Sequence, residues 1–161
     1  MPDIVERRDR LLALVAAQSQ NDADGLPSSL LSRICLAVDE DMSGSGAGIT
    51  VMSGAGWRGV VAATNPLSEQ MEELQLVCGE GPCLDAVRLG HPILVDDLED
   101  RVWGDWTGYA PAAQAAGVRA VFAFPIHVGA ARVGALDVYR LTAGSLSRQS
   151  DAPFSGFKKL N

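Results

Sequence analysis

A helix begins within the segment Leu76-Val77-Cys78-Gly79-Glu80-Gly81-Pro82-Cys83-Leu84-Asp85-Ala86. Gly79 and Gly81 permit backbone angles that other residues avoid, and Pro82 suits the first helical position because an N–H there would have no helical partner. The segment therefore predicts a short helix over residues 82–89, ended by Gly90. Residues 91–97 are mostly apolar and end in turn-forming residues, which predicts a short strand.

The bulk composition describes one globular domain. The chain has 161 residues, of which 47% are hydrophobic and 20% charged, enough for a sizeable core. No apolar run approaches the ~20 residues of a transmembrane helix, and residues 1–10 lack the apolar core of a signal peptide. These features predict a cytoplasmic protein with no membrane partner. The net charge of −7, with only 13 Lys and Arg, argues against direct nucleic-acid binding.

Hydrophobic periodicity predicts the other elements. Helices are expected at residues 4–18, 27–42, 66–76 and 111–116, and strands at 47–53, 57–64, 119–128 and 132–140. The predicted organisation is an N-terminal helix within residues 1–20, a domain over 21–146 and an irregular tail over 147–161. The first helix either packs on its own domain or forms half of a homodimer interface. Pro125 predicts an edge, a bulge or a local end of strand pairing.

Four ordered motifs carry a family resemblance. They are Gly79-Glu80-Gly81-Pro82-Cys83-Leu84-Asp85-Ala86, Pro92-Ile93-Leu94-Val95-Asp96-Asp97-Leu98, Tyr109-Ala110-Pro111-Ala112-Ala113 with Gly117-Val118-Arg119-Ala120-Val121-Phe122-Ala123-Phe124-Pro125, and Val128-Gly129 with Arg132-Val133-Gly134-Ala135-Leu136-Asp137-Val138-Tyr139-Arg140. Together they resemble the GAF domains of actinobacterial GAF–ANTAR regulators, from about Leu30 to Leu146. The resemblance implies an α+β GAF fold, PAS-like, with a central antiparallel sheet of five to six strands and helices on both faces.

The resemblance also implies a function. The expected role is signal sensing in a bacterial antitermination-type transcription regulator, through an unknown small-molecule ligand or through dimerisation. Residues 147–161 depart from the amphipathic helix that leads into the ANTAR domain in the relatives, and no ANTAR helices are present. The chain itself is therefore not expected to bind RNA.

A ligand pocket is expected, by the same resemblance, between one sheet face and the segments that cross it. Its cover would come from Cys83 and from an aromatic segment, and its floor from the last two strands. The candidate residues are Cys83, Trp103, Trp106, Tyr109, Phe122, Phe124, Asp137 and Tyr139. Asp137 is the one acidic residue in an apolar strand, and a buried carboxylate needs a partner, from the ligand or the protein. The alternative is a filled pocket in a module that only dimerises.

Cys83 carries the redox alternatives. It lies in the first turn of the predicted helix, where the helix dipole lowers a thiol pKa, and Cys78 is placed as a possible resolving partner. One branch of the GAF superfamily reduces free methionine sulfoxide with a cysteine in a similar turn. That branch needs a later cysteine, which residues 100–117 lack. The chain is therefore expected not to be an enzyme, with a thiol-based redox sensor or reductase as the alternative.

No metal site or cofactor is predicted. His91 and His127 are the only histidines, and neither has a second ligand at a standard spacing. The acidic residues between Asp96 and Asp100 lack the alternating ligands of a calcium loop. No phosphate-binding loop is found between a strand and a helix.

Overall fold

The centre of the molecule is an antiparallel sheet of five strands. A computed structural model describes residues 30–53, 56–100 and 105–146, and gives the strand order β2-β1-β5-β4-β3. All neighbouring strands pair antiparallel. The strands are β1 (Gly46–Ser53), β2 (Gly56–Ala63), β3 (Ile93–Val95), β4 (Ala120–Val128) and β5 (Ala131–Arg140). The predicted α+β class and its antiparallel sheet are confirmed.

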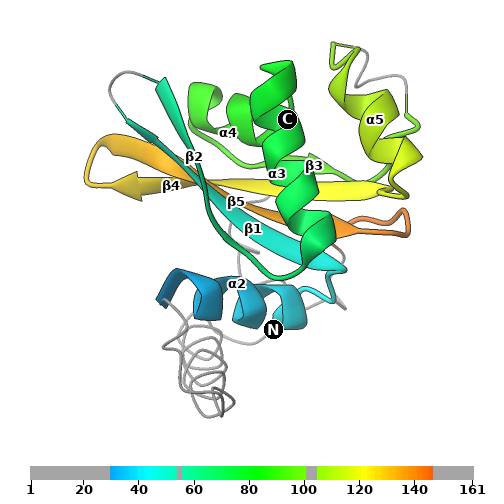
Figure 1. Cartoon of the computed structure of the whole chain (residues 1–161), viewed down its shortest axis with the longest axis horizontal. Helices are drawn as coiled ribbons and strands as arrows, with labels where there is room; N and C mark the ends of the chain where they lie inside the picture. The colour runs from blue at the N-terminus through cyan, green and yellow to red at the C-terminus, as the bar shows by residue number, and fades with distance from the viewer. Residues whose placement is uncertain (1–29, 54–55, 101–104, 147–161) are drawn as a thin grey trace.

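Helices cover both faces of this sheet, as predicted. Figure 1 shows α2 (Leu30–Asp41) below the sheet, and α3 (Pro66–Cys78), α4 (Pro82–Leu89) and α5 (Tyr109–Ala115) above it. The helix expected within residues 1–20, the tail over 147–161 and Trp103 lie outside the described residues. Within the described ranges, no helix is both long enough and apolar enough to cross a membrane.

The turn between α3 and α4 forms as its residues predict. Gly79 caps the end of α3 with φ 66°, in the left-handed region that favours glycine. Pro82 is the first residue of α4, and Gly90, with φ 76°, ends this helix. Local residue chemistry therefore determines both ends of α4.

The two faces of the sheet bury different side chains because strand residues alternate. In β4 and β5, Phe122 is opposite Val138, and Ala123 is opposite Asp137. The first pair packs with α2, while Ala123 packs with Cys83 of α4. Pro125 pairs with Ala135 of β5 but lies beyond Ala123, the last β4 residue that pairs with β3. Of the three alternatives predicted for Pro125, the structure therefore shows a local end of pairing, on the β3 side.

Helix α5 begins at Tyr109, two residues before the expected start at Pro111. The reason is a tertiary contact. The Glu80 Oε1 atom accepts hydrogen bonds from the backbone N–H groups of Gly108 (2.6 Å) and Tyr109 (2.9 Å). A carboxylate from the α3–α4 turn thus binds the free amides at the start of α5.

Candidate functional site

Three buried acidic groups meet between the sheet and its upper helices. Glu72 comes from α3, Cys83 from α4 and Asp137 from β5, and each residue is 0% exposed. One carboxylate oxygen or sulfur atom from each lies within 4.8 Å of the other two. We call these three residues the acidic cluster. Buried carboxylates are costly unless they are paired or hydrogen-bonded, so the surroundings of each group decide its charge.

Glu72 is well supplied with hydrogen bonds. Tyr139 Oη donates to Glu72 Oε1 (3.0 Å), and Thr50 Oγ1 donates to Glu72 Oε2. Glu72 reaches the sheet because the β1 residue paired with Asp137 is Gly48, which has no side chain to block it. A Cβ added at Gly48 would lie 2.6 Å from Glu72 Cγ. The two hydroxyl donors are those that an ionised carboxylate needs.

Gln75 connects the Glu72 carboxylate, through Tyr139, to the start of α4. Its Oε1 atom accepts a hydrogen bond from the Cys83 backbone N–H (2.8 Å), in the first turn of α4. Its Nε2 atom donates to Tyr139 Oη (3.2 Å), the same hydroxyl that donates to Glu72. A continuous hydrogen-bonded chain therefore runs from the α4 amide to the Glu72 carboxylate.

Asp137 is held differently from Glu72. Its carboxyl group contacts Glu72, Cys83 and Gln75, and the contact with Glu72 favours a proton between the two carboxyl groups. Neither Asp137 oxygen accepts a hydrogen bond of standard geometry from a described residue, and the buried Tyr109 hydroxyl has no hydrogen bond among these residues. Buried polar groups are normally paired, so the Tyr109 hydroxyl requires an explanation.

The charge of the pair follows from these contacts. Burial raises the pKa of Asp137 well above its usual range, and the nearby Glu72 carboxylate raises it further. Burial also raises the pKa of Glu72, while contacts with Asp137, Thr50 and Tyr139 lower it. Of the two carboxyl groups, Asp137 has the more strongly raised pKa, so it keeps a proton to higher pH than Glu72 does.

Cys83 differs from its expected chemistry. The helix start predicts a lowered thiol pKa, but burial raises the Cys83 pKa well above its usual value, and Asp137 and Glu72 add to the increase. The hydrogen bond from the Leu84 backbone acts in the opposite direction and is outweighed. Desolvation in the core dominates the helix-terminus effect. Cys78, its proposed redox partner, packs in a separate group of side chains around α5.

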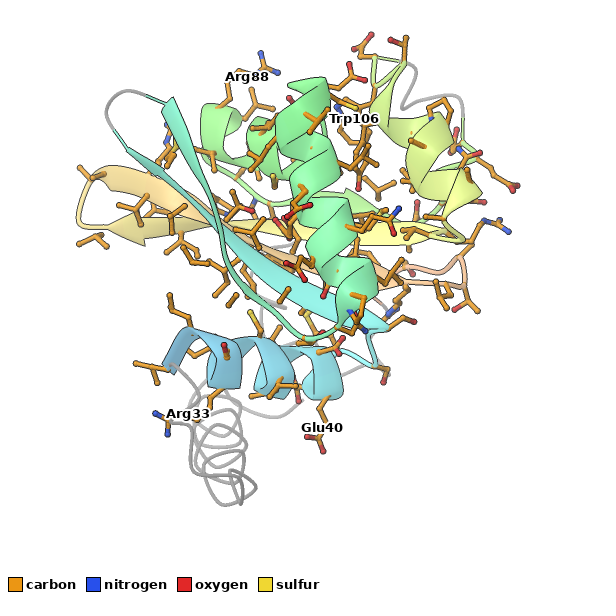
Figure 2. The ribbon with its side chains drawn as sticks, viewed as in Figure 1. Arg33, Glu40, Arg88 and Trp106 are labelled. Carbon is orange, nitrogen blue, oxygen red and sulfur yellow. The ribbon has the colours of Figure 1, made fainter. Side chains whose placement is uncertain are left out.

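The aromatic segment fills space above the sheet. Trp106 lies between α3 and α5 in Figure 2, and its ring meets that of Tyr109 edge-on, with centroids 6.1 Å apart. Trp106 Nε1 donates to Asp85 Oδ2 of α4 (3.0 Å). Tyr109 is fully buried against Tyr139 and Met71 in one group of core side chains. These rings close the acidic cluster instead of presenting an open stacking surface.

The predicted pocket residues thus separate into two sets. Cys83, Tyr109, Asp137 and Tyr139 come together on the upper face with Trp106 beside them, whereas Phe122 and Phe124 pack against α2 on the lower face. The prediction that Phe122 and Phe124 share the pocket floor with Asp137 is wrong. Strand alternation and the β4–β5 register direct both rings to the opposite face of the sheet. Figure 2 shows Arg33 and Glu40 pointing outward from the far side of α2.

The sequence reasoning missed Glu72, Gln75 and Thr50. The buried stripe of α3 comprises Ser68, Met71, Glu72 and Gln75 rather than an apolar face. Its i, i+3, i+4, i+7 spacing was available, because these positions share one helix face with Met71. This spacing, together with the need of Asp137 for a partner, points to Glu72.

A second feature lies on the molecular surface. A groove of about 530 Å³ runs along α4, lined by Met52, Leu76, Gly79, Leu84, Asp85, Val87, Arg88 and Arg132. The Arg132 guanidinium donates to the carbonyls of Val87 (2.9 Å) and Arg88 (2.7 Å), so it is engaged at the end of α4. The groove shares no lining residue with the acidic cluster.

Comparisons with known proteins bear on the fold. The family model described as "GAF domain" matches residues 27–153. A free methionine-R-sulfoxide reductase from Neisseria meningitidis, solved with its substrate, superposes with a TM-score of 0.61 and 14% identity, over 97% of this chain and 86% of that one. The GAF domain of a phosphoenolpyruvate–protein phosphotransferase from Coxiella burnetii gives 0.60 and 14%, over 92% and 88%.

A further neighbour comes from a signalling protein. A domain assigned to a two-component sensor histidine kinase of Sinorhizobium meliloti gives a TM-score of 0.54 and 19% identity, over 74% of this chain and 76% of that one. Among curated proteins, none matches the sequence significantly. Identities this low carry the fold alone.

Proposed function

Because the chain belongs to the GAF domain family, a signal-sensing fold, we propose that it senses a small ligand bound at the acidic cluster. The observation that carries the proposal is the fully buried Tyr109 hydroxyl, which has no hydrogen bond among the described residues and is acted on electrostatically by the acidic cluster. It lies between the sheet and its covering helices, where the family resemblance expects a ligand. A ligand with a matching polar group would supply the partner of this hydroxyl.

The surrounding hydrogen bonds offer a route for the signal. Glu72 is connected through Tyr139 and Gln75 to the first-turn amide of α4. Tyr109 lies at the first turn of α5, which Glu80 anchors to the α3–α4 turn. A ligand that changes these contacts would favour one arrangement of the two short helices over another.

We extend the proposal to the regulatory setting that the sequence motifs indicate. The chain acts as the sensory domain of an antitermination-type transcription regulator, in the cytoplasm and as a homodimer. It is not a catalyst, and with a net charge of −7 it does not itself bind nucleic acid.

Two alternatives have distinct signatures. A dimerisation module with a filled interior is favoured by the buried Trp106 and Tyr109 rings. A thiol enzyme or redox sensor is disfavoured by the raised pKa of Cys83, because the thiolate is the reactive form. Cys83-dependent reduction of free methionine sulfoxide would refute the non-catalytic assignment.

Native mass spectrometry tests the sensing proposal. The full chain is purified from its own host and measured under native and denaturing conditions, beside the Asp137→Asn variant. We expect a small bound mass that denaturation releases and that the variant retains poorly. If the wild type and the variant are both dimers without a bound mass under native conditions, the dimerisation module would be established instead.

A further inference from the structure

The geometry points to a divalent transition-metal site of the Zn²⁺ class, with Cys83 Sγ and one carboxylate oxygen each from Glu72 and Asp137 as ligands. This inference rests on the proposed function, because it names the ligand class of the same cluster. It needs no rearrangement of the fold, since the three ligands come from α3, α4 and β5, which already pack together.

The distances suit a compact coordination sphere. Tetrahedral zinc has Zn–S bonds of about 2.3 Å and Zn–O bonds of about 2.0–2.2 Å, which separate neighbouring ligand atoms by roughly 3.5 Å. The candidate ligand atoms of the cluster are already within 4.8 Å of one another. Bringing these atoms to the roughly 3.5 Å separation of a tetrahedral site therefore requires only small side-chain shifts.

The Tyr109 hydroxyl is a second observation that points to a ligand. It is fully buried and has no hydrogen bond among the described residues, and Asp137, Cys83 and Glu72 all act electrostatically on it. In the metal site an oxygen of Asp137 would exchange its contact with Glu72 for a bond to the ion, and the Tyr109 hydroxyl would offer a polar contact nearby.

An outer shell is already in place for Glu72. The hydroxyls of Thr50 and Tyr139 each donate to one of its oxygens and fix the plane of the carboxylate. Outer-shell hydrogen bonds of this kind orient metal ligands and tune their affinity. The Gln75 bond to the Cys83 backbone likewise fixes the helix turn that carries the sulfur ligand.

The donor set selects the class of ion. A thiolate favours Zn²⁺ and similar transition ions over Mg²⁺ and Ca²⁺, which take oxygen ligands. Binding forms one metal–sulfur and two metal–oxygen bonds and releases the protons held by Cys83 and Asp137. Three anionic ligands and one divalent ion leave a net charge of −1.

Cobalt titration tests the site on the full chain after chelator treatment. We expect about one equivalent of Co²⁺ to bind with a near-ultraviolet sulfur-to-metal charge-transfer band that Zn²⁺ displaces. Cys83→Ala should abolish the band. Cys35→Ala is the matched control, because Cys35 is also 0% exposed but lies on the opposite face of the sheet.

A second variant keeps the test decisive if Cys83→Ala does not fold. Asp137→Asn preserves the shape of the side chain and should weaken Co²⁺ binding at least about tenfold, since even outer-shell losses cost this much. Circular dichroism confirms that each variant compared is folded.

The outcomes distinguish the metal site from the sensing proposal on which it rests. A charge-transfer band that requires Cys83 but not Cys35 supports the metal site. No band, or one that survives Cys83→Ala, overturns it. If the metal site fails and native mass spectrometry still finds a releasable organic compound, the sensing proposal stands and only the ligand class is wrong; if neither ion nor compound binds, both fail.

Discussion

Replacing Asp137 by Asn tests the charge state of the metal-free acidic cluster. Burial and the Glu72 carboxylate raise the pKa of Asp137 well above its usual value. The folded protein therefore keeps a proton that the unfolded chain loses above about pH 4. Stability from this proton is fully present below the unfolded pKa and decreases as the pH rises toward the folded pKa.

The magnitude depends on one proton. At pH values where the folded state holds the Asp137 proton and the unfolded state does not, the free energy of unfolding falls by about 1.4 kcal/mol per pH unit. Between pH 5 and pH 7 the wild type should therefore lose stability from this group, with about 2.7 kcal/mol as the upper limit for one proton. Asn cannot titrate, so the stability of Asp137→Asn relative to wild type should improve across the same interval, by no more than that amount.

Urea unfolding of chelator-treated protein at pH 5, 6 and 7 measures the difference. Asp97→Asn is the control. The backbone N–H of Glu99 and the Arg119 guanidinium lower the pKa of Asp97, so its stabilising effect is lost only below about pH 4. Its profile should run parallel to wild type between pH 5 and 7. A parallel profile for Asp137→Asn would refute the protonated Asp137.

The remaining predictions concern packing and access in the same region. Gln75→Ala should cost about 2–4 kcal/mol in urea unfolding, because it leaves two buried partners unbonded; a loss below about 0.5 kcal/mol would contradict this. Gly48→Ala should cost about 1–3 kcal/mol in the same assay, since its Cβ would overlap the Glu72 side chain, and an unchanged midpoint would show that the helix yields freely. In native thiol titration at pH 8, Cys78 should react first because it is partly exposed, whereas Cys35 and Cys83 are fully buried; rapid labelling of Cys83 would show that the cluster opens readily.

Local chemistry made part of the fold predictable. The turn around Gly79 and Gly81, with Pro82 opening α4 and Gly90 ending it, is determined by backbone preferences of the residues themselves. The start of α5 was less predictable. It depends on Glu80, a residue 29 positions before Tyr109, whose carboxylate binds the first free amides.

The candidate site was likewise only partly predictable from the sequence. Asp137 stands out in the sequence because a carboxylate inside an apolar strand requires a partner. That partner is Glu72, which sequence reasoning assigned no role, since helix glutamates are usually solvated. Nothing local shows that this helix face packs against a strand more than 60 residues later, with Gly48 leaving the space between them.

The sequence by itself determined the two ends of α4 and the unusual position of Asp137, because these follow from local backbone preference and periodicity. The antiparallel α+β class was indicated by the family resemblance of the sequence motifs. Only the tertiary structure decided that Phe122 and Phe124 face α2 while Asp137 faces α3. It also decided that the Cys83 thiol has a raised pKa. Alternation assigns residues to two faces within one strand, but the register between strands decides which faces coincide, and burial outweighs the helix dipole only once the core has assembled.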